Sequence, residues 1–256
     1  MTGTRYDRIG VGYANTRRED PRTARRIIDA LGDARTVVNV GAGSGSYEPT
    51  DRHVIAIEPS DTMASQRPPH RSPAIRATAG ALPLRNDSVD AAMAVLTVHH
   101  WDDEQARGVH EMRRIARGPV VIVTIDPLVS ETMWLLADYL PEIAALDRRI
   151  FPPIATLERW LGPETVTTVL PVARDTCDWT LLSFWAHPER VLDAAARRAT
   201  SGFARLPAAT VRRAVEAVQG DLDSGRWDEA HGSLRELDEL DVGLRLVSHP
   251  GRRGQP

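Results

Sequence analysis

A glycine-rich turn follows a run of β-branched residues early in the chain. The run Thr36–Val40 leads directly into Gly41-Ala42-Gly43-Ser44-Gly45. Glycines in this position allow a tight turn and let a bound molecule approach the backbone closely. The dinucleotide-binding fingerprint has glycine at its first, third and sixth positions, whereas the sixth position here is Ser46. The turn therefore predicts a ligand site that differs from the usual dinucleotide site.

The connection after this turn is too short for a full crossover helix. Only the eight residues Ser46 to His53 separate Gly45 from the next apolar run, and Pro49 lies among them. A parallel crossover normally needs about a dozen residues or more. A bound pyrophosphate depends on the N-terminus of the helix that such a crossover contains. The sequence therefore favours a ligand that carries an adenosine but no pyrophosphate.

An acidic residue ends the next apolar run. Glu58 follows Val54–Ile57 and lies 17 positions after Gly41. A carboxylate at the tip of the second strand accepts hydrogen bonds from ribose hydroxyls, about 20 residues after the first glycine. The glycine turn or the carboxylate alone would equally suit an ordinary surface turn. Together, each at the end of a buried-looking strand, they predict a nucleoside-binding site.

The elements that position these residues alternate between strands and helices. Continuous apolar runs without alternation are typical of strands buried on both faces of a parallel sheet. Helical patterns are predicted for Asp20–Leu31 and Asp103–Ala116. We therefore expect an α/β, Rossmann-like, mostly parallel sheet with helices on both faces. The predicted strands are Thr36–Val40, Val54–Ile57, Ala91–Val98 and Val120–Ile125, with further runs at Val166–Val172 and Val242–Val247.

From about Arg35 to Pro127 the chain resembles the class I S-adenosylmethionine-dependent methyltransferases, and within them the bacterial methyltransferase type 11 group. The resemblance implies that S-adenosylmethionine is the cofactor and that the protein is an enzyme that transfers its methyl group. The matching segments are Val40-Gly41-Ala42-Gly43-Ser44-Gly45, Glu58-Pro59-Ser60 with Met63, Ala81-Leu82-Pro83-Leu84 with Asp87-Ser88-Val89-Asp90, and Leu96-Thr97-Val98-His99-His100-Trp101 with Glu111-Met112-Arg113-Arg114-Ile115.

The resemblance also implies how the cofactor is held. The glycine turn would wrap its methionine part, Glu58 would hold the ribose, and Met63 would pack near the adenine. Thr78 stands where the family usually has an acid that bonds the adenine amino group. Arg17 would meet the cofactor carboxylate, although a solvated surface arginine fits this position equally well. The predicted cofactor-binding residues are Tyr13, Arg17, Gly41, Ala42, Gly43, Glu58, Pro59, Met63, Thr78, Ala79, Val95, Leu96 and His100.

The resemblance suggests one domain over residues 1–256. Residues 1–34 would form N-terminal helices that close over the cofactor, and residues 35–127 the cofactor-binding core. Residues 128–165 carry aromatic residues between prolines and predict a helical insertion after the fifth strand that covers the substrate. Residues 166–250 would complete the sheet and its helices.

Methyl transfer from a sulfonium is an in-line displacement with a neutral leaving group, so the protein mainly aligns the reactants. A base helps where the acceptor is a hydroxyl or an amine. His99 and His100 follow a strand at the edge where ligands bind, and histidine titrates near neutral pH. They are the catalytic candidates, with structural packing as the alternative role.

Aromatic residues after the fifth strand are candidates for an apolar acceptor pocket, because small-molecule sites are mostly apolar. Each of them taken singly is also a plausible core residue. The predicted substrate-binding residues are Trp134, Tyr139, Trp179 and Trp185, and Phe151 and Trp160 are further candidates for the same lid.

Composition narrows the classes of partner. The net charge is −3, which gives no overall field that attracts phosphate backbones, so we expect no nucleic-acid partner. The single cysteine, Cys177, excludes an internal disulfide and a cysteine-based zinc site, and we expect no metal. No apolar window reaches the ~18 residues of a membrane span. We expect a cytoplasmic monomer or homodimer that acts on a small molecule, with no membrane partner.

Three alternatives stay open. Ser46 and the short connection argue against a nicotinamide- or flavin-dependent oxidoreductase. A non-catalytic module that binds S-adenosylmethionine and a methyltransferase that acts on RNA or protein also fit the chain. The identity of the acceptor and the kind of atom methylated stay open, because one scaffold serves many acceptors.

Overall fold

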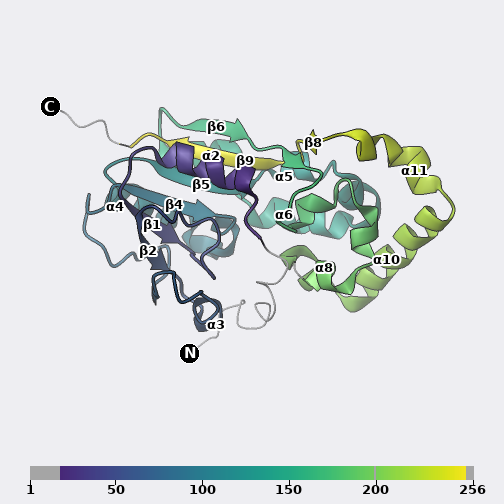
Figure 1. The fold of residues 1–256 in the computed structure, drawn as a ribbon, viewed down its shortest axis with the longest axis horizontal. Helices are drawn as coiled ribbons and strands as arrows, with labels where there is room; N and C mark the ends of the chain where they lie inside the picture. The colour runs from purple at the N-terminus through teal and green to yellow at the C-terminus, as the bar shows by residue number, and fades with distance from the viewer. Residues whose placement is uncertain (1–17, 199, 252–256) are drawn as a thin grey trace.

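The computed structural model describes residues 18–198 and 200–251, and a seven-stranded sheet lies at their centre (Figure 1). Tyr13 and Arg17 fall outside the described residues. The strand order is β3-β2-β1-β4-β5-β9-β6. The first five strands of this order are parallel, and β9 runs antiparallel to both of its neighbours, β5 and β6. The predicted α/β Rossmann-like fold is confirmed. The strands are β1 Thr36–Val40, β2 His53–Ile57, β3 Ala74–Ile75, β4 Ala91–Val95, β5 Val120–Ile125, β6 Val166–Val169 and β9 Leu244–His249.

Helix α2 (Pro21–Leu31) covers one face of the sheet. Asp20 caps its N-terminus by accepting a hydrogen bond from the Arg22 backbone N–H, and Pro21 occupies the first turn, where no N–H partner is needed. The helix buries Ile27 and Leu31 in the same core cluster as Val37 of β1. The capping residue and the proline are therefore the local reason why the predicted helix begins where it does.

The opposite face is covered by α4 (Gln105–Ile115) and α7 (Ile154–Leu161). Met112 of α4 and Leu157 and Leu161 of α7 are fully buried in one cluster with Val38 and Ala92 of the sheet. Helix α7 was expected in the insertion over the substrate. It packs instead beside the sheet, because its apolar stripe meets the stripe of α4.

A second group of helices lies at one end of the sheet, on the right of Figure 1. We call it the helical group, and two stretches of chain on either side of β6 build it. Helices do follow the fifth strand, as predicted, but residues after β6 contribute at least as much. The helical group comprises α5 Pro127–Ser130, a π-helical turn Leu135–Tyr139, α6 Pro141–Ile150, α8 Ala194–Arg198, α9 Ser201–Ala204, α10 Ala208–Asp223 and α11 Arg226–His231.

Short elements connect these layers. The predicted strand Val166–Val172 divides into β6 and β7 (Val172–Ala173), and β7 pairs with β8 (Glu239–Leu240) in a separate two-stranded sheet. No helix in the described part of the chain is long and apolar enough to cross a membrane. The remaining short helices are α3 Asp61–Ala64 and 3-10 turns at Val98–His100, Asp102–Glu104, Leu181–Phe184, Pro188–Val191 and Gly232–Glu236.

Candidate active site

The glycine turn lies at the carboxyl edge of the sheet, between β1 and β2. Gly41, Gly43 and Gly45 have φ angles of +72°, +52° and +98°, which side chains other than glycine's rarely adopt. A Cβ on Gly41 would stand 2.1 Å from Oγ1 of Thr97. The backbone N–H groups of Gly41 and Ala42 both donate to the carbonyl of Ile57, each at 2.9 Å. The turn is therefore pressed against the ends of β2 and β4, and the lack of side chains on its glycines lets a ligand approach it closely.

Glu58 holds this edge together. Its side chain is buried, and one carboxylate oxygen accepts from the Gly43 N–H at 2.8 Å. The other accepts from the Ser60 N–H, also at 2.8 Å. The carboxylate thus joins the glycine turn to the segment after β2, which is where the sequence predicted the ribose-binding acid.

No helix follows the glycine turn, and a buried ion pair occupies its place. Glu48 accepts from Nη2 of Arg67 at 2.8 and 2.9 Å, and the two side chains are 1% and 3% exposed. Asn39 of β1 donates to the same carboxylate at 3.1 Å, and Arg67 also reaches the Gly43 carbonyl at 3.3 Å. Sequence reasoning found the missing helix but not this pair, because no spacing rule relates Glu48 to Arg67.

The other predicted cofactor residues differ in how deeply they are buried near the turn. Met63 is buried in α3, and its methyl group lies 3.3 Å from where a Cβ on Gly43 would stand. Leu96 directly follows β4, has a φ of +51° and donates its N–H to the Val123 carbonyl at 2.8 Å. The side chain of Thr78 is exposed, whereas Ala79 is buried against the α4 face. Pro59 and Val95 are half-buried.

These residues fit S-adenosylmethionine. Glycines in the left-handed region open the backbone of the turn toward a ligand, as the methionine part requires. Glu58 lies at the tip of the second strand, where a carboxylate accepts from ribose hydroxyls. The short connection offers no long helix N-terminus for a pyrophosphate.

His99 and His100 form a 3-10 turn directly after β4. The buried His99 ring stacks on Phe151, with ring centroids 4.0 Å apart, and meets the His100 ring at a tilt, with centroids 3.7 Å apart. Burial holds the pKa of His99 well below its usual value, and the nearby His100 and Arg205 lower it further. Phe151 therefore contacts the histidine pair, whereas Trp160, the other extra lid candidate, packs beside the α4–α7 cluster.

Two charged residues that sequence reasoning missed lie beside the histidines. Nη2 of Arg205 is 3.1 Å from Nδ1 of His100. Asp147 of α6 is 8% exposed, and burial raises the pKa of its carboxyl to about 7, against the opposing effect of Arg205. Both come from the helical group, so no local pattern around the histidines could have identified them.

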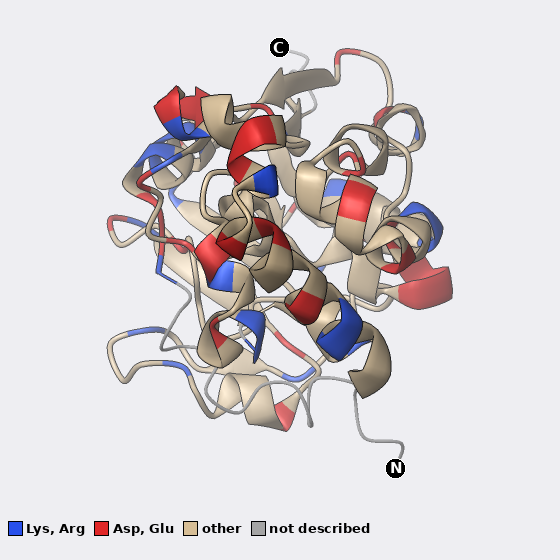
Figure 2. Cartoon of the chain, turned by 90° about the vertical axis from the view of Figure 1, so that its right-hand side faces the viewer, with Lys and Arg blue, Asp and Glu red and all other residues tan. Residues whose placement is uncertain are grey.

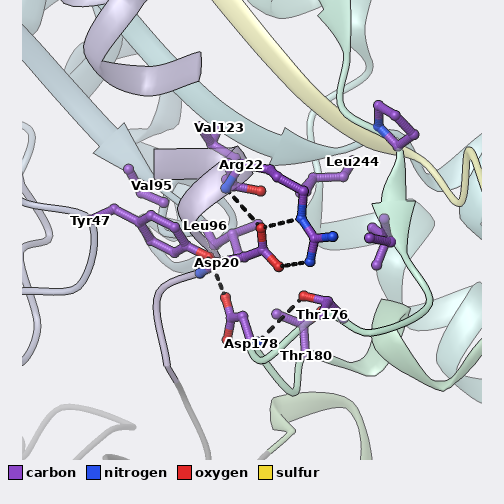
Figure 3. A pocket seen from close by; sticks show the side chains of 14 residues that line it. Asp20, Arg22, Tyr47, Val95, Leu96, Val123, Thr176, Asp178, Thr180 and Leu244 are labelled. Atoms are coloured by element: carbon purple, nitrogen blue, oxygen red, sulfur yellow. Dashed lines mark hydrogen bonds and ion pairs between the residues drawn. The ribbon is translucent and has the colours of Figure 1, made fainter. Parts of the chain in front are cut away.

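A small cavity lies over the ends of β4, β5 and β9, and Tyr47, two residues after the glycine turn, forms part of its lining (Figure 3). Leu96, Val123 and Leu244 form its apolar side. On its polar side the Tyr47 hydroxyl donates to Asp178 at 2.8 Å and accepts from the Asp20 N–H at 3.2 Å. The rest of the lining comprises Arg22, Thr23, Val95, Pro171, Val172, Ala173, Thr176 and Thr180.

The aromatic residues predicted to bind substrate do not form one pocket. Trp134, Tyr139 and Trp185 are 3%, 8% and 0% exposed. Nε1 of Trp134 donates to the Trp185 carbonyl at 2.9 Å, and the Tyr139 hydroxyl donates to Asp221 at 2.7 Å. These three side chains pack the interior of the helical group, since large apolar rings gain most from full burial. Trp179 alone is half-buried, with the Arg190 guanidinium 4.7 Å from its ring centre.

Comparison with known proteins agrees with this geometry. Residues 38–123 match the model of a methyltransferase domain. The crystal structure of a protein described as a methyltransferase from an antibiotic biosynthesis pathway of Anabaena variabilis is similar, with a TM-score of 0.84 and 28% identity. That match covers 91% of this chain and 98% of the other. No curated protein gives a significant match.

Two more distant structures share the fold and contain S-adenosylhomocysteine, the demethylated cofactor. One is a geranyl diphosphate C-methyltransferase of Streptomyces coelicolor, with a TM-score of 0.52, 15% identity, and 90% and 78% of the two chains covered. The other is a phosphoethanolamine N-methyltransferase of Haemonchus contortus, with a TM-score of 0.55 and 12% identity. That match covers 97% of this chain and 56% of the other. With its glycine turn, its strand-end carboxylate and a matched methyltransferase domain over residues 38–123, this chain has the fold and the domain of S-adenosylmethionine-dependent methyltransferases.

Proposed function

We propose that this methyltransferase acts on a small-molecule acceptor, bound over the ends of β4, β5 and β9. The observation that carries the proposal is the cavity of Figure 3, which is lined by Tyr47, two residues after the glycine turn, and by Leu96, directly after β4. Ligands of open α/β sheets bind outside the carboxyl ends of the strands. An acceptor there would lie next to a cofactor that is held over β1 and β2.

The character of the cavity supports a small acceptor. Aliphatic side chains line one side, and hydroxyl and carboxylate groups line the other, which is the usual composition of a small-molecule site. The Anabaena variabilis structure, similar over nearly the whole chain, is described as belonging to antibiotic biosynthesis, and such pathways process small molecules. We take the half-buried Trp179, next to Asp178, as a further contact for the acceptor.

We assign the following roles in cofactor and acceptor binding to the residues of this chain. The bound cofactor supplies an activated methyl group on a sulfonium. The glycine turn and Leu96 would orient its methionine part, and Glu58 would hold the ribose. Pro59, Met63, Thr78 and Ala79 would border the adenine. We propose that one of His99 and His100 lies within reach of the acceptor, and that Tyr47 orients it.

We do not carry Trp134, Tyr139 and Trp185 into the acceptor site, because their rings are enclosed in the helical group. We further propose a cytoplasmic protein, monomeric or homodimeric, that binds no nucleic acid. Acidic and basic residues alternate along the helices at the end of the molecule that Figure 2 faces, and the net charge is −3. A mixed surface of this kind gives little electrostatic attraction to phosphate backbones.

The first test is calorimetry with S-adenosylmethionine on the wild type and on Glu58→Gln, with NAD as control ligand. We expect micromolar binding to the wild type, about −8 kcal/mol. The variant should bind at least about 10-fold more weakly, a loss of about 1.4 kcal/mol, because one carboxylate oxygen, which only accepts hydrogen bonds, becomes an amide nitrogen, which only donates them. NAD should give no heat of binding.

The acceptor is then sought by incubating the protein with a radiolabelled cofactor and panels of amines, carboxylic acids, phenols and RNA. Label transferred to a small molecule supports the proposal. Label that appears only on RNA or protein would exclude a small-molecule acceptor. If the protein binds the cofactor but transfers no label to any compound in the panels, the result would favour a non-catalytic module that binds S-adenosylmethionine.

A further inference from the structure

The contact between Arg205 and His100 joins the helical group to the carboxyl edge of the sheet. Arg205 directly follows α9, and His100 lies in the turn after β4. Nη2 of the guanidinium and Nδ1 of the imidazole are 3.1 Å apart, which is a hydrogen-bond distance. The two groups are 105 positions apart in the sequence, so tertiary packing alone creates the pair.

The chemistry of arginine decides which histidine form this contact allows. A guanidinium has five N–H donors and no acceptor, and it keeps its proton in proteins. Nδ1 of His100 must therefore present its lone pair, which places the ring proton on Nε2. A proton on Nδ1 would remove the hydrogen bond and set two cations side by side. The neutral Nε2–H form of His100 is the form that satisfies the contact.

The surroundings favour the same form. The His99 ring contacts the His100 ring, and burial favours the neutral form of His99, so His99 adds no positive charge near Arg205. Asp147 is buried close enough to Arg205 for the two charges to interact. The guanidinium thus has an acceptor in His100 and a neighbouring carboxyl on α6.

We propose that Arg205 is a positioning residue that fixes His100 in its neutral Nε2–H form, so that His100 serves the site as a hydrogen-bond donor and not as a general base. The catalytic meaning of this assignment rests on the proposed function. An acceptor at this edge must then bring an available lone pair, as a carboxylate or an uncharged amine does, or pass its proton to a group other than the two imidazoles.

The test is long-range proton–nitrogen NMR on protein labelled with ¹⁵N-histidine. The His100 signals are identified by their loss in His100→Gln. In the wild type at about pH 7.5 we expect a protonated Nε2 and an unprotonated Nδ1. In Arg205→Met at the same pH, the His100 signals should show a mixture of both tautomers, because the contact that selects the Nε2–H form is then lost. Arg205→Lys should keep the wild-type pattern, since an ammonium also only donates.

Arg212→Met is the matched control, because Arg212 is exposed on α10 and its loss should leave the His100 signals unchanged. An imidazolium or an Nδ1–H form in the wild type at pH 7 would overturn the proposal, as would an unchanged spectrum in folded Arg205→Met. If that variant does not fold, the wild-type spectrum still decides. Calorimetry with S-adenosylmethionine and the label-transfer assay test the proposed function on the same samples, so the tautomer result and the proposed function can fail independently.

Discussion

Asp147 shows how a single buried carboxyl affects the whole protein. Burial raises its pKa from an ordinary 3.8 to about 7. The folded state therefore holds this proton more tightly than the unfolded state between those two values. The free energy of unfolding falls as pH rises through this window and is lowered by a constant amount above it.

Asp147→Asn should consequently stabilise the protein at high pH. The neutral amide avoids the cost of an ionised buried carboxyl, so we expect a gain of roughly 2 to 4 kcal/mol at pH 8 and almost none at pH 4. Urea unfolding at both pH values measures the difference. Asp103→Asn, at an exposed position, should change stability by less than about 0.5 kcal/mol. Equal gains for Asp147→Asn at both pH values would show that ionisation is not the cause.

At the scale of elements, the Glu48–Arg67 pair replaces the helix that normally follows the glycine turn. Arg67→Met would leave a buried carboxylate without its partner, which costs about 3 to 5 kcal/mol. It would also free the Gly43 carbonyl and so weaken S-adenosylmethionine binding. Urea unfolding and calorimetry measure the two effects.

Two further variants isolate the cause. Arg76→Met breaks the exposed pair with Asp61 and should cost at most about 1 kcal/mol, without changing cofactor binding. The double variant Arg67→Met with Glu48→Gln removes the buried charge and should recover part of the lost stability. If the double variant were as unstable as the sum of its parts, the unpaired charge would not be the source of the loss.

The elements also show what the sequence could predict. The glycine turn, Glu58 and helix α2 depend on neighbouring residues, and their positions followed from local patterns of glycine, charge and capping. Arg67 and Arg205 act on residues 19 and 105 positions away, which no local pattern reveals. The tryptophans were assigned to the acceptor because they follow a strand at the ligand edge. Their position in the helical group depends on α10 and α11, and no local pattern shows how these helices pack.

At the scale of the whole molecule, the sheet and the helical group share one core. Trp134 meets Trp227 of α11 edge to face, with ring centroids 5.4 Å apart. Both rings lie in the same buried cluster as Met93 of β4 and Val121 of β5. Because apolar packing is continuous from strands to helices, the two parts should unfold together.

Trp227→Ala tests this continuity. The ring is 1% exposed, and its loss should cost about 3 to 5 kcal/mol. We expect one cooperative transition in each protein. Far-UV circular dichroism and tryptophan fluorescence should give the same midpoint as each other in the wild type, and likewise in the variant, at a lower value. Trp179→Ala, at a half-buried ring near the cavity, should cost much less and chiefly raise the KM for the acceptor. Two separate transitions in Trp227→Ala would mean that the helical group folds on its own, and that its contact with His100 is a contact between independent units.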